Sequence, residues 1–360
     1  MKLFFSKYIQ TFLAVVTLLV SPSVVKASNS DQAEKTTRKI VVTPKILKGK
    51  IIYSRNNGML WMMDPITRRE QIALKNPFSK EYWEPFAAGV AFSPDLQHVA
   101  LVHKPSSKNA NFPFRGNELF IVNIGNGACR KLTNTNVRLR VQEPRFSPDG
   151  TRIVYVRRTG MRSGGPGYTG MEIRVVNADG SGDRHIVGDV NDLSQSYFSA
   201  FWSRDGKKLL YTHYSGNIDY EDEGRNKREL EIYDLESKII QSFDGNYSTF
   251  HRPDVSPDGD FLSVIEPLNP DLCSWSLKLR LYTSQKQYVR DLVRNSDLFM
   301  LNSHWSQDNK RIAFEATQYF TKVARGGRAS EERVTGIWIV GADAKNLNRL
   351  STDTSLIAWL

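Results

Sequence analysis

The feature that most constrains this chain of 360 residues is a short motif that recurs at a nearly fixed interval. Five copies of an aromatic or apolar residue followed by Ser-x-Asp stand directly before an alternating apolar stretch, and successive copies of this anchor residue are 54, 56, 53 and 50 positions apart. The five anchors are Phe92, Phe146, Trp202, Val255 and Trp305. A fixed period of this length is typical of solenoids and propellers, in which each repeat is one unit of supersecondary structure.

Each repeat also carries a regular pattern of apolar residues. Directly after the motif comes a stretch with alternating apolar residues, such as "RIVYVR" or "KLLYTH", and two more follow around a polar turn, as in "EIRVVNADGSGDRHI". Alternation with a period of two, bounded by turn residues, favours strands over helices. Together with a first strand that ends at the anchor, each repeat has four short strands, which is one blade of a β-propeller.

The Ser-x-Asp motif predicts a tight turn and not an acidic catalytic site. Ser, Pro and Gly at its first, second and fourth positions suit a type I turn, in which the Asp side chain accepts backbone amides. A residue type repeated in every module is architectural. Leu96 stands where Gly is expected, so we predict a looser turn there, and Asn309 is the next best residue at positive φ. The repeated aspartates are Asp95, Asp149, Asp205, Asp258 and Asp308.

The two ends of the sequence complete a ring. Residues 49–74 supply the second, third and fourth strands of a blade, and "SLIAWL" at the C-terminus places Trp359 54 positions after Trp305. We therefore expect an all-β fold, a six-bladed propeller over residues 49–360, in which the C-terminal strand joins blade 1 as its innermost strand. Such closure leaves no open sheet edge. Residues 28–48 fit either a linker or an extra edge strand.

The first 27 residues read as an export signal. Lys2 and Lys7 form a basic start, residues 11–20 are almost wholly apolar, and Ala27 ends a plausible cleavage site. The apolar run is shorter than the about 20 residues that a bilayer-spanning helix needs. We expect a periplasmic or secreted protein, with no membrane span after cleavage.

The net charge indicates which kinds of partner the protein could bind. The net charge is +11, and cleavage after Ala27 removes three lysines and no acid, which leaves +11 − 3 = +8. A basic surface attracts anionic partners, and in an exported protein this favours an acidic protein or an anionic glycan over nucleic acid.

Cys129 and Cys273 fall in opposite blades and on opposite faces, so we expect no disulfide. We expect a monomer.

The repeats resemble those of TolB-type propellers, the periplasmic component of the bacterial Tol system. Residues 175–186, "VVNADGSGDRHI", and 202–212, "WSRDGKKLLYT", carry the resemblance, which extends over residues 49–360. TolB has an α/β domain ahead of its propeller, whereas here only residues 28–48 separate the signal from blade 1, so we expect that domain to be lacking. The resemblance implies a six-bladed ring that binds a peptidoglycan-associated lipoprotein at the mouth of its channel.

The order of the strands within each blade predicts which face of the ring binds a partner. Turns between first and second and between third and fourth strands are short and share one face, whereas connections between second and third strands are long and share the other. Long loops on a rigid scaffold are the usual place for binding. Glu221 makes this face acidic in blade 4, and Arg158 and Arg325 make it basic in blades 3 and 6. Such a rim would orient a charged partner, although solvated loops are an open alternative.

Polar residues are expected at the channel mouth, just before each anchor. Lining a water-filled channel is the open alternative to binding. The candidates are Glu143, Ser199, His251, Arg252, Asn302 and His304, with Trp83 and Tyr197 nearby.

The sequence favours a binding module over an enzyme. It has no Gly-x-Ser-x-Gly nucleophile elbow and no clustered metal-ligand spacing, so we expect no cofactor. The leading hypothesis is a non-catalytic module for an envelope or cell-wall-associated protein. The alternative is a metal-dependent lyase acting on acidic oligosaccharides in the channel, with His213, His251 and His304 as ligands and Glu143 and Arg252 as acid and base. A structural role in an envelope assembly is a third hypothesis.

Overall fold

The structure is a computed structural model of the full chain. It describes residues 47–55, 59–75, 77, 89–103, 117–135, 139–159, 170–192, 194–215, 227–242, 251–267, 277–285, 287–295, 297–323, 329–352 and 354–360. All of these belong to one compact unit, Val42–Leu360. The predicted export signal and most of the segment 28–48 lie outside the described residues, and both assignments stay predictions.

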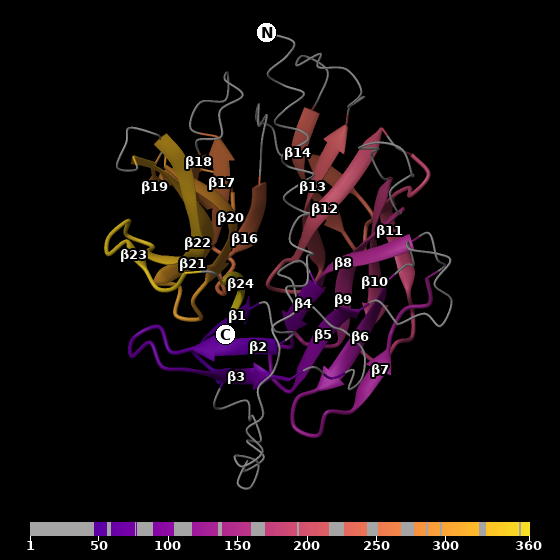
Figure 1. Cartoon of the computed structure of the whole chain (residues 1–360). Helices are drawn as coiled ribbons and strands as arrows, with labels where there is room; N and C mark the ends of the chain where they lie inside the picture. Colours follow the sequence, from indigo (N-terminus) through magenta and orange to yellow (C-terminus); the bar gives the residue numbers. More distant parts are fainter. Residues whose placement is uncertain are drawn as a thin grey trace, which may run out of the picture. The chain divides into compact units, whose positions relative to one another are not determined.

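The described residues form six four-stranded antiparallel sheets that stand in a ring, as predicted (Figure 1). Blade 1 contains β24 (Ser355–Trp359), β1 (Ile51–Arg55), β2 (Met59–Met63) and β3 (Glu70–Leu74). Blade 2 contains β4 (Val90–Phe92), β5 (His98–His103), β6 (Glu118–Asn123) and β7 (Cys129–Lys131). Blade 3 contains β8 (Leu139–Phe146), β9 (Arg152–Thr159), β10 (Met171–Asn177) and β11 (Arg184–Gly188).

The second half of the ring repeats this pattern. Blade 4 contains β12 (Gln195–Trp202), β13 (Lys208–Ser215), β14 (Lys227–Asp234) and β15 (Ile240–Ser242). Blade 5 contains β16 (His251–Val255), β17 (Phe261–Pro267), β18 (Leu277–Thr283) and β19 (Tyr288–Arg294). Blade 6 contains β20 (Leu298–Trp305), β21 (Arg311–Val323), β22 (Ala329–Gly341) and β23 (Asn348–Arg349). The first strands of successive blades contact one another in a closed circle, from β4 through β24 and back to β4.

The core consists of apolar layers between neighbouring blades. Alternation along each strand explains this arrangement, because successive side chains point to opposite faces of a sheet. In β9, Ile153 and Tyr155 pack against blade 2, whereas Val154 and Val156 pack against blade 4. Each blade is therefore held by burial on both faces.

The Ser-x-Asp motifs form the predicted turns. In all five, the Ser hydroxyl donates to the Asp carboxylate at 2.5–2.6 Å, and the backbone amide two residues after the Asp donates to the same carboxylate at 3.0–3.1 Å. The hydrogen bonds from the Ser147 hydroxyl and the Thr151 amide lower the pKa of Asp149 to about 2. These carboxylates stabilise turns.

The prediction of a looser turn at Leu96 is wrong. Leu96 takes a left-handed φ of 56° and its amide donates to the Ser93 carbonyl at 2.9 Å, within the 2.8–3.0 Å range of the other four motifs. Its side chain packs against the apolar layer between blades 1 and 2, which holds the residue in this conformation. Asn309 has a φ of 59°, as its position predicted.

Both kinds of short turn share one face, as predicted. In blades 2 to 6 the first residue after the third strand donates its amide to a carbonyl of the Ser-x-Asp turn, at 2.8–2.9 Å. The five donors are Ile124, Ala178, Leu235, Ser284 and Ala342. Cys129, which follows such a turn in blade 2, is exposed and is not in a disulfide; Cys273 lies outside the described residues.

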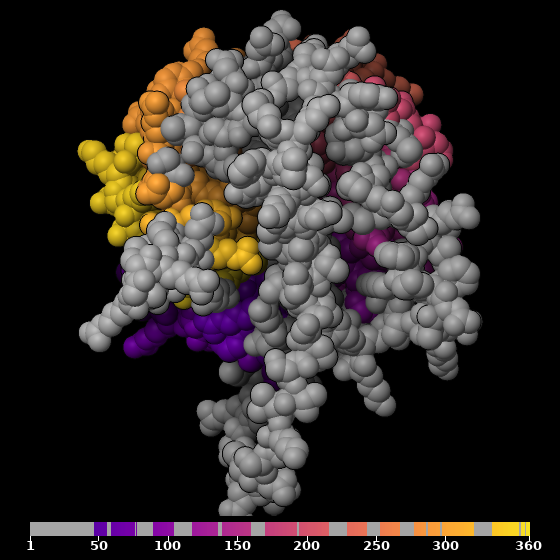
Figure 2. All heavy atoms as spheres, turned by 45° about the horizontal axis from the view of Figure 1, so that its top comes forward, coloured from indigo at the N-terminus to yellow at the C-terminus, as the bar shows by residue number. Residues whose placement is uncertain are grey.

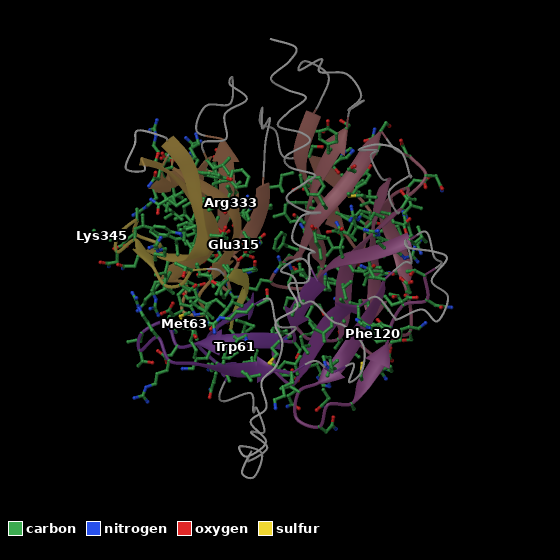
Figure 3. All side chains as sticks on the ribbon, in the orientation of Figure 1. Trp61, Met63, Phe120, Glu315, Arg333 and Lys345 are labelled. Atoms are coloured by element: carbon green, nitrogen blue, oxygen red, sulfur yellow. The ribbon has the colours of Figure 1, made fainter. Side chains whose placement is uncertain are left out.

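The two ends of the propeller close the ring as predicted. β24 pairs with β1, so blade 1 is built from both ends of the propeller sequence. Figure 2 shows indigo atoms, from the start of the propeller, beside yellow atoms from its end. Glu315 of β21 holds the closing strand from blade 6, because its carboxylate accepts the Leu356 amide at 3.0 Å (Figure 3). Leu360 packs with Leu47 in the layer between blades 1 and 2.

Candidate functional site

The connections between second and third strands and those between blades lie at the end of the blades opposite the Ser-x-Asp turns. Most of their residues, including the predicted site residues Trp83, Glu221 and Arg325, lie outside the described part of the chain. The sequence predicts that residues 317–334, between the second and third strands of blade 6, form one of the long connecting loops, and this prediction is wrong. The ladder between β21 and β22 in fact continues from the pair Thr317–Thr335 to the pair Val323–Ala329. The alternating Thr317, Tyr319, Thr321 and Val323 suit a strand.

A β-bulge lies near the middle of the first strand in blades 3 to 6. The predicted mouth residues Glu143, Ser199 and Asn302 lie at these bulges, and Glu143 and Ser199 have left-handed φ values of 55° and 54°. The carboxylate of Glu143 accepts the backbone amide of Ser199 from the next blade, at 2.6 Å. Glu143 therefore links blades 3 and 4, a structural role that sequence reasoning did not predict.

A second group of polar residues directly precedes the anchors of blades 3, 5 and 6, and consists of Arg145, Asp254 and His304. The carboxylate of Asp254 accepts the Trp305 amide at 3.1 Å, and His304 Nδ1 lies 3.8 Å from Asp254 Oδ2. Burial raises the pKa of Asp254 to about 6, although the charge of Arg145 opposes this shift. Arg145 in turn lies over the Phe201 ring, with its Cζ 4.7 Å from the ring centroid.

Sequence reasoning found His304 but missed Arg145 and Asp254. The sequence does distinguish these two residues, because Arg145 and Asp254 directly precede the anchors of blades 3 and 5. Blades 1 and 2 have alanine at the same position. His251 and Arg252 lie in β16, whose backbone is described but whose side chains there are not. Their assignment to the mouth stays a prediction.

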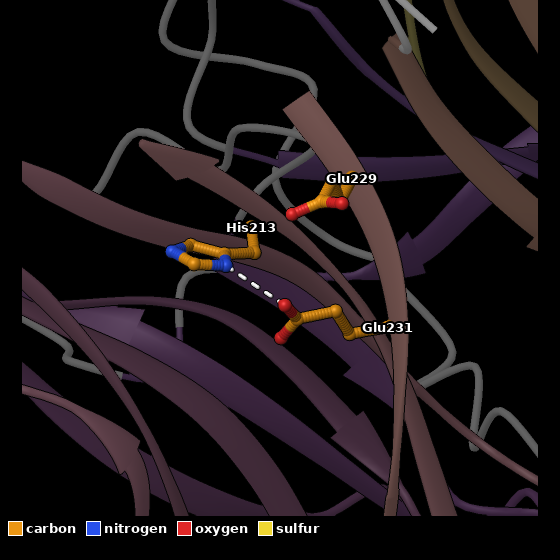
Figure 4. Close-up of side chains that lie close together, drawn as sticks. All are labelled: His213, Glu229 and Glu231. Atoms are coloured by element: carbon orange, nitrogen blue, oxygen red, sulfur yellow. Dashed lines mark hydrogen bonds and ion pairs between the residues drawn. The ribbon is translucent and has the colours of Figure 1, made fainter. Parts of the chain in front are cut away.

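Tyr197 belongs to a third polar group, in blade 4. Its ring stacks on His213, with centroids 4.5 Å apart and planes inclined by 6°. His213 Nδ1 lies 2.9 Å from Glu231 Oε1, and His213 Nε2 lies 2.6 Å from Gln195 Oε1 (Figure 4). Burial and the nearby Glu231 carboxylate raise the pKa of Tyr197.

Among the described residues, His213, Glu229 and Glu231 are the one group whose ligand atoms could hold a metal ion, since these atoms lie within 4.8 Å of one another. The lyase hypothesis instead needed His213, His251 and His304 to converge. His213 contacts Gln195 and Glu231 within blade 4, whereas His304 lies beside Asp254 of blade 5. The structure does not bring these two histidines together.

Arg158 lies at the long-loop end of blade 3, as predicted. It pairs across the ladder with Arg140, so two guanidinium-bearing side chains start from directly opposed positions. Both arginines are half-buried, and burial followed by the charge of Arg140 lowers the pKa of Arg158, which Glu143 partly offsets. Within the described residues, the buried Nε of Arg158 has no hydrogen-bond partner.

The neighbouring Arg157 is different. It points to the other face of the sheet and forms a 2.5 Å ion pair with the buried Glu172, which also contacts Arg174. Within the described part of blade 3, the predicted basic character of the rim therefore rests on Arg158 and Arg140, and not on Arg157.

No protein-family model matches the sequence. No curated protein matches it either. Among the described residues, no helix is long and apolar enough to span a membrane.

Solved structures do share the fold. TolB from Acinetobacter baumannii superposes with a TM-score of 0.53 at 14% identity, over 86% of this chain and 67% of that one. A putative TolB from Agrobacterium tumefaciens gives a TM-score of 0.50 at 14% identity, over 84% and 89%. Oligogalacturonate lyase from Vibrio parahaemolyticus gives 0.51 at 15% identity, over 84% and 77%. At these identities the likeness establishes the six-bladed propeller fold alone.

Proposed function

We propose that this chain is an exported propeller that binds an envelope or cell-wall-associated protein through its long-loop face. The observation that carries the proposal is the opposed pair Arg140–Arg158 at that end of blade 3. Like charges directly opposite one another on a sheet are destabilising. An acidic group from a partner would offset this repulsion.

The location of the pair supports this function. Arg140 lies at the start of β8 and Arg158 near the end of β9, next to the long connections and on inner strands of the ring. Alternation places both on the face of blade 3 that packs toward blade 4, because Val141 packs toward blade 2 and Val156 toward blade 4. A guanidinium pair held by a rigid sheet presents preorganised donors to a carboxylate.

The sequence and the fold together support a proposal for the compartment. Residues 1–27 have the pattern of an export signal, and the propeller resembles that of TolB in its repeats. We propose a periplasmic or secreted location. The net charge of +8 after cleavage favours an acidic protein surface as partner.

Capture from envelope extracts tests the function. The mature chain and an Arg140→Gln, Arg158→Gln double variant are immobilised, and the captured proteins are identified by chemical crosslinking and mass spectrometry. Arg204→Gln is the matched control, since Arg204 contacts Asp258 on the short-turn face. We expect the same acidic partner with the wild type and the control, and at least tenfold less with the double variant. Equal capture by all three would overturn the proposal.

A further inference from the structure

We propose that His213, Glu231 and Glu229 form a binding site for a divalent first-row transition-metal ion, of the zinc and manganese class. The three side chains come from the adjacent strands β13 and β14 of blade 4 (Figure 4). This site is distinct from the arginine pair and does not depend on the function proposed above.

The imidazole of His213 faces an oxygen atom at each of its two nitrogens. Gln195 Oε1 lies 2.6 Å from Nε2, and Glu231 Oε1 lies 2.9 Å from Nδ1. A neutral imidazole carries one N–H. With that proton on Nε2, which donates to Gln195, the lone pair of Nδ1 points at a carboxylate oxygen. In this tautomer, a cation bound to both Nδ1 and Glu231 would replace the contact between two acceptors by two coordination bonds, whereas a proton on Nδ1 makes the same contact an ordinary hydrogen bond.

The arrangement around the ring matches that of metal-binding histidines. Such histidines donate their other N–H to an oxygen acceptor, which fixes the tautomer, and Gln195 supplies that acceptor here. Stacking on Tyr197 fixes the plane of the ring. With bonds of roughly 2.0–2.2 Å, two ligand atoms of one ion lie about 3 Å apart at right angles and about 3.4 Å apart in a tetrahedron, so the 2.9 Å separation of Nδ1 and Oε1 needs to lengthen only slightly when an ion binds.

Comparison between blades singles out blade 4. In blades 3 and 5 the residue equivalent to Glu231 is an arginine, which pairs with a carboxylate of its own sheet. Arg174 contacts Glu172 and Asp183, and Arg280 contacts Glu266 and Asp291. Blade 4 instead places a second carboxylate at this position, beside His213.

Tyr211 provides an independent observation. It pairs with Glu231 across the ladder, as Tyr155 pairs with Arg174 in blade 3. The Tyr155 hydroxyl donates to Asp183 at 2.8 Å, whereas the fully buried Tyr211 hydroxyl makes no hydrogen bond of good geometry. The Glu231 carboxylate is an acceptor near this hydroxyl. A water or hydroxide ligand on the metal would satisfy this hydroxyl.

The donor set selects the class of ion. Imidazole nitrogen is a ligand for zinc and other transition ions, whereas calcium and magnesium take oxygen ligands. One nitrogen with two carboxylates therefore favours Zn²⁺ or Mn²⁺ over Ca²⁺ and Mg²⁺.

Calorimetric titration of the chelator-treated mature chain with ZnCl₂ and with MnCl₂ tests the site. We expect one ion per chain for at least one of the two metals. His213→Gln and Glu231→Gln should weaken binding at least tenfold, with circular dichroism confirming that both variants fold. The matched controls are His185→Gln and Glu236→Gln, which remove an exposed imidazole and an exposed carboxylate elsewhere, and they should bind as the wild type does.

Diffraction from wild-type crystals soaked in ZnCl₂ provides a readout that needs no variant. We expect an anomalous peak within coordination distance of His213 Nδ1 and Glu231. No binding of either ion by the wild type would overturn the proposal and leave Nδ1–H as a donor to Glu231, with the Gln195 amide reversed. Equal affinity of the wild type and the two site variants, or a peak elsewhere, would overturn it as well.

Discussion

Ile51, in the first strand of the propeller, pairs directly with Trp359, the penultimate residue of the chain. Both side chains lie in the apolar layer between blades 6 and 1, where Trp359 is 5% exposed. Two segments some 300 positions apart in the sequence therefore share one blade. The stability of the ring depends on this contact, because every blade is held by its two neighbours.

Removal of the Trp359 side chain should destabilise the whole propeller. Replacing a buried aromatic residue by alanine costs about 3–5 kcal/mol, so we expect Trp359→Ala to lower the free energy of unfolding by that amount. Deletion of residues 355–360 should cost more, since it removes a strand. Chemical denaturation measures both, with Ile66→Ala as a control at a residue 79% exposed. A truncated chain that unfolds like the intact one would show that the ring does not need its closing strand.

The turn motif makes a local prediction. The buried Ser147 hydroxyl donates to Asp149 and accepts the Arg152 amide at 2.9 Å. Ser147→Ala leaves that amide without its partner, which costs about 1–3 kcal/mol. The pKa of Asp149, about 2 in the wild type, should rise toward its ordinary value. Denaturation and an NMR titration measure the two effects, and Ser181→Ala at an exposed turn is the control; no change in either quantity would contradict the role of Ser147.

The fold was predictable from the sequence because the same pattern of strands and turns recurs with five copies of the anchor motif. The anchor spacing gave the number of blades, and the position of Trp359 gave the closure. The turn at Leu96 was misjudged because its conformation is set by packing against another blade, which one motif read in isolation does not reveal. The β21–β22 hairpin was missed because Gly326, Gly327 and the charged residues around them have the composition of a loop.

The site was less predictable because its contacts depend on register. Arg140 and Arg158 are 18 positions apart, and only the pairing of β8 with β9 makes them neighbours. Asp254 and Trp305 come from different blades and meet through the bulges of the inner strands. Charge patterns in the sequence indicated Arg158, but its partner across the strand could be identified only from the ladder.

Asp254 predicts a pH dependence. Its pKa is raised from 3.8 to about 6 by burial, so the folded chain holds this proton more tightly than the unfolded chain does. The stabilisation is therefore fully present below about pH 4 and is lost as the pH rises through about 6. Two pKa units correspond to a change on the order of 3 kcal/mol. Asp254→Asn should remove this dependence.

The measurement is the difference in unfolding free energy between wild type and Asp254→Asn from pH 4 to pH 8. Groups that do not contact Asp254 titrate equally in both proteins, so the difference isolates Asp254 together with His304, whose Nδ1 lies 3.8 Å from its carboxylate. We expect the wild type to lose stability relative to the variant as the pH rises. A difference that stays constant over this range would show that Asp254 has an ordinary pKa, and that Arg145 offsets the effect of burial.

Arg157 and Arg158 allow a direct comparison of a structural and a binding residue. Arg157→Gln breaks the ion pair with the buried Glu172 and should lower the free energy of unfolding by about 1–3 kcal/mol. Arg158→Gln removes one member of a like-charged cross-strand pair, so stability should stay constant or rise by up to about 1 kcal/mol. Capture of the acidic partner should nevertheless weaken in the Arg158 variant. A residue whose removal stabilises the free protein and weakens binding is retained for binding, whereas equal destabilisation by both variants would assign Arg158 to the structure of blade 3.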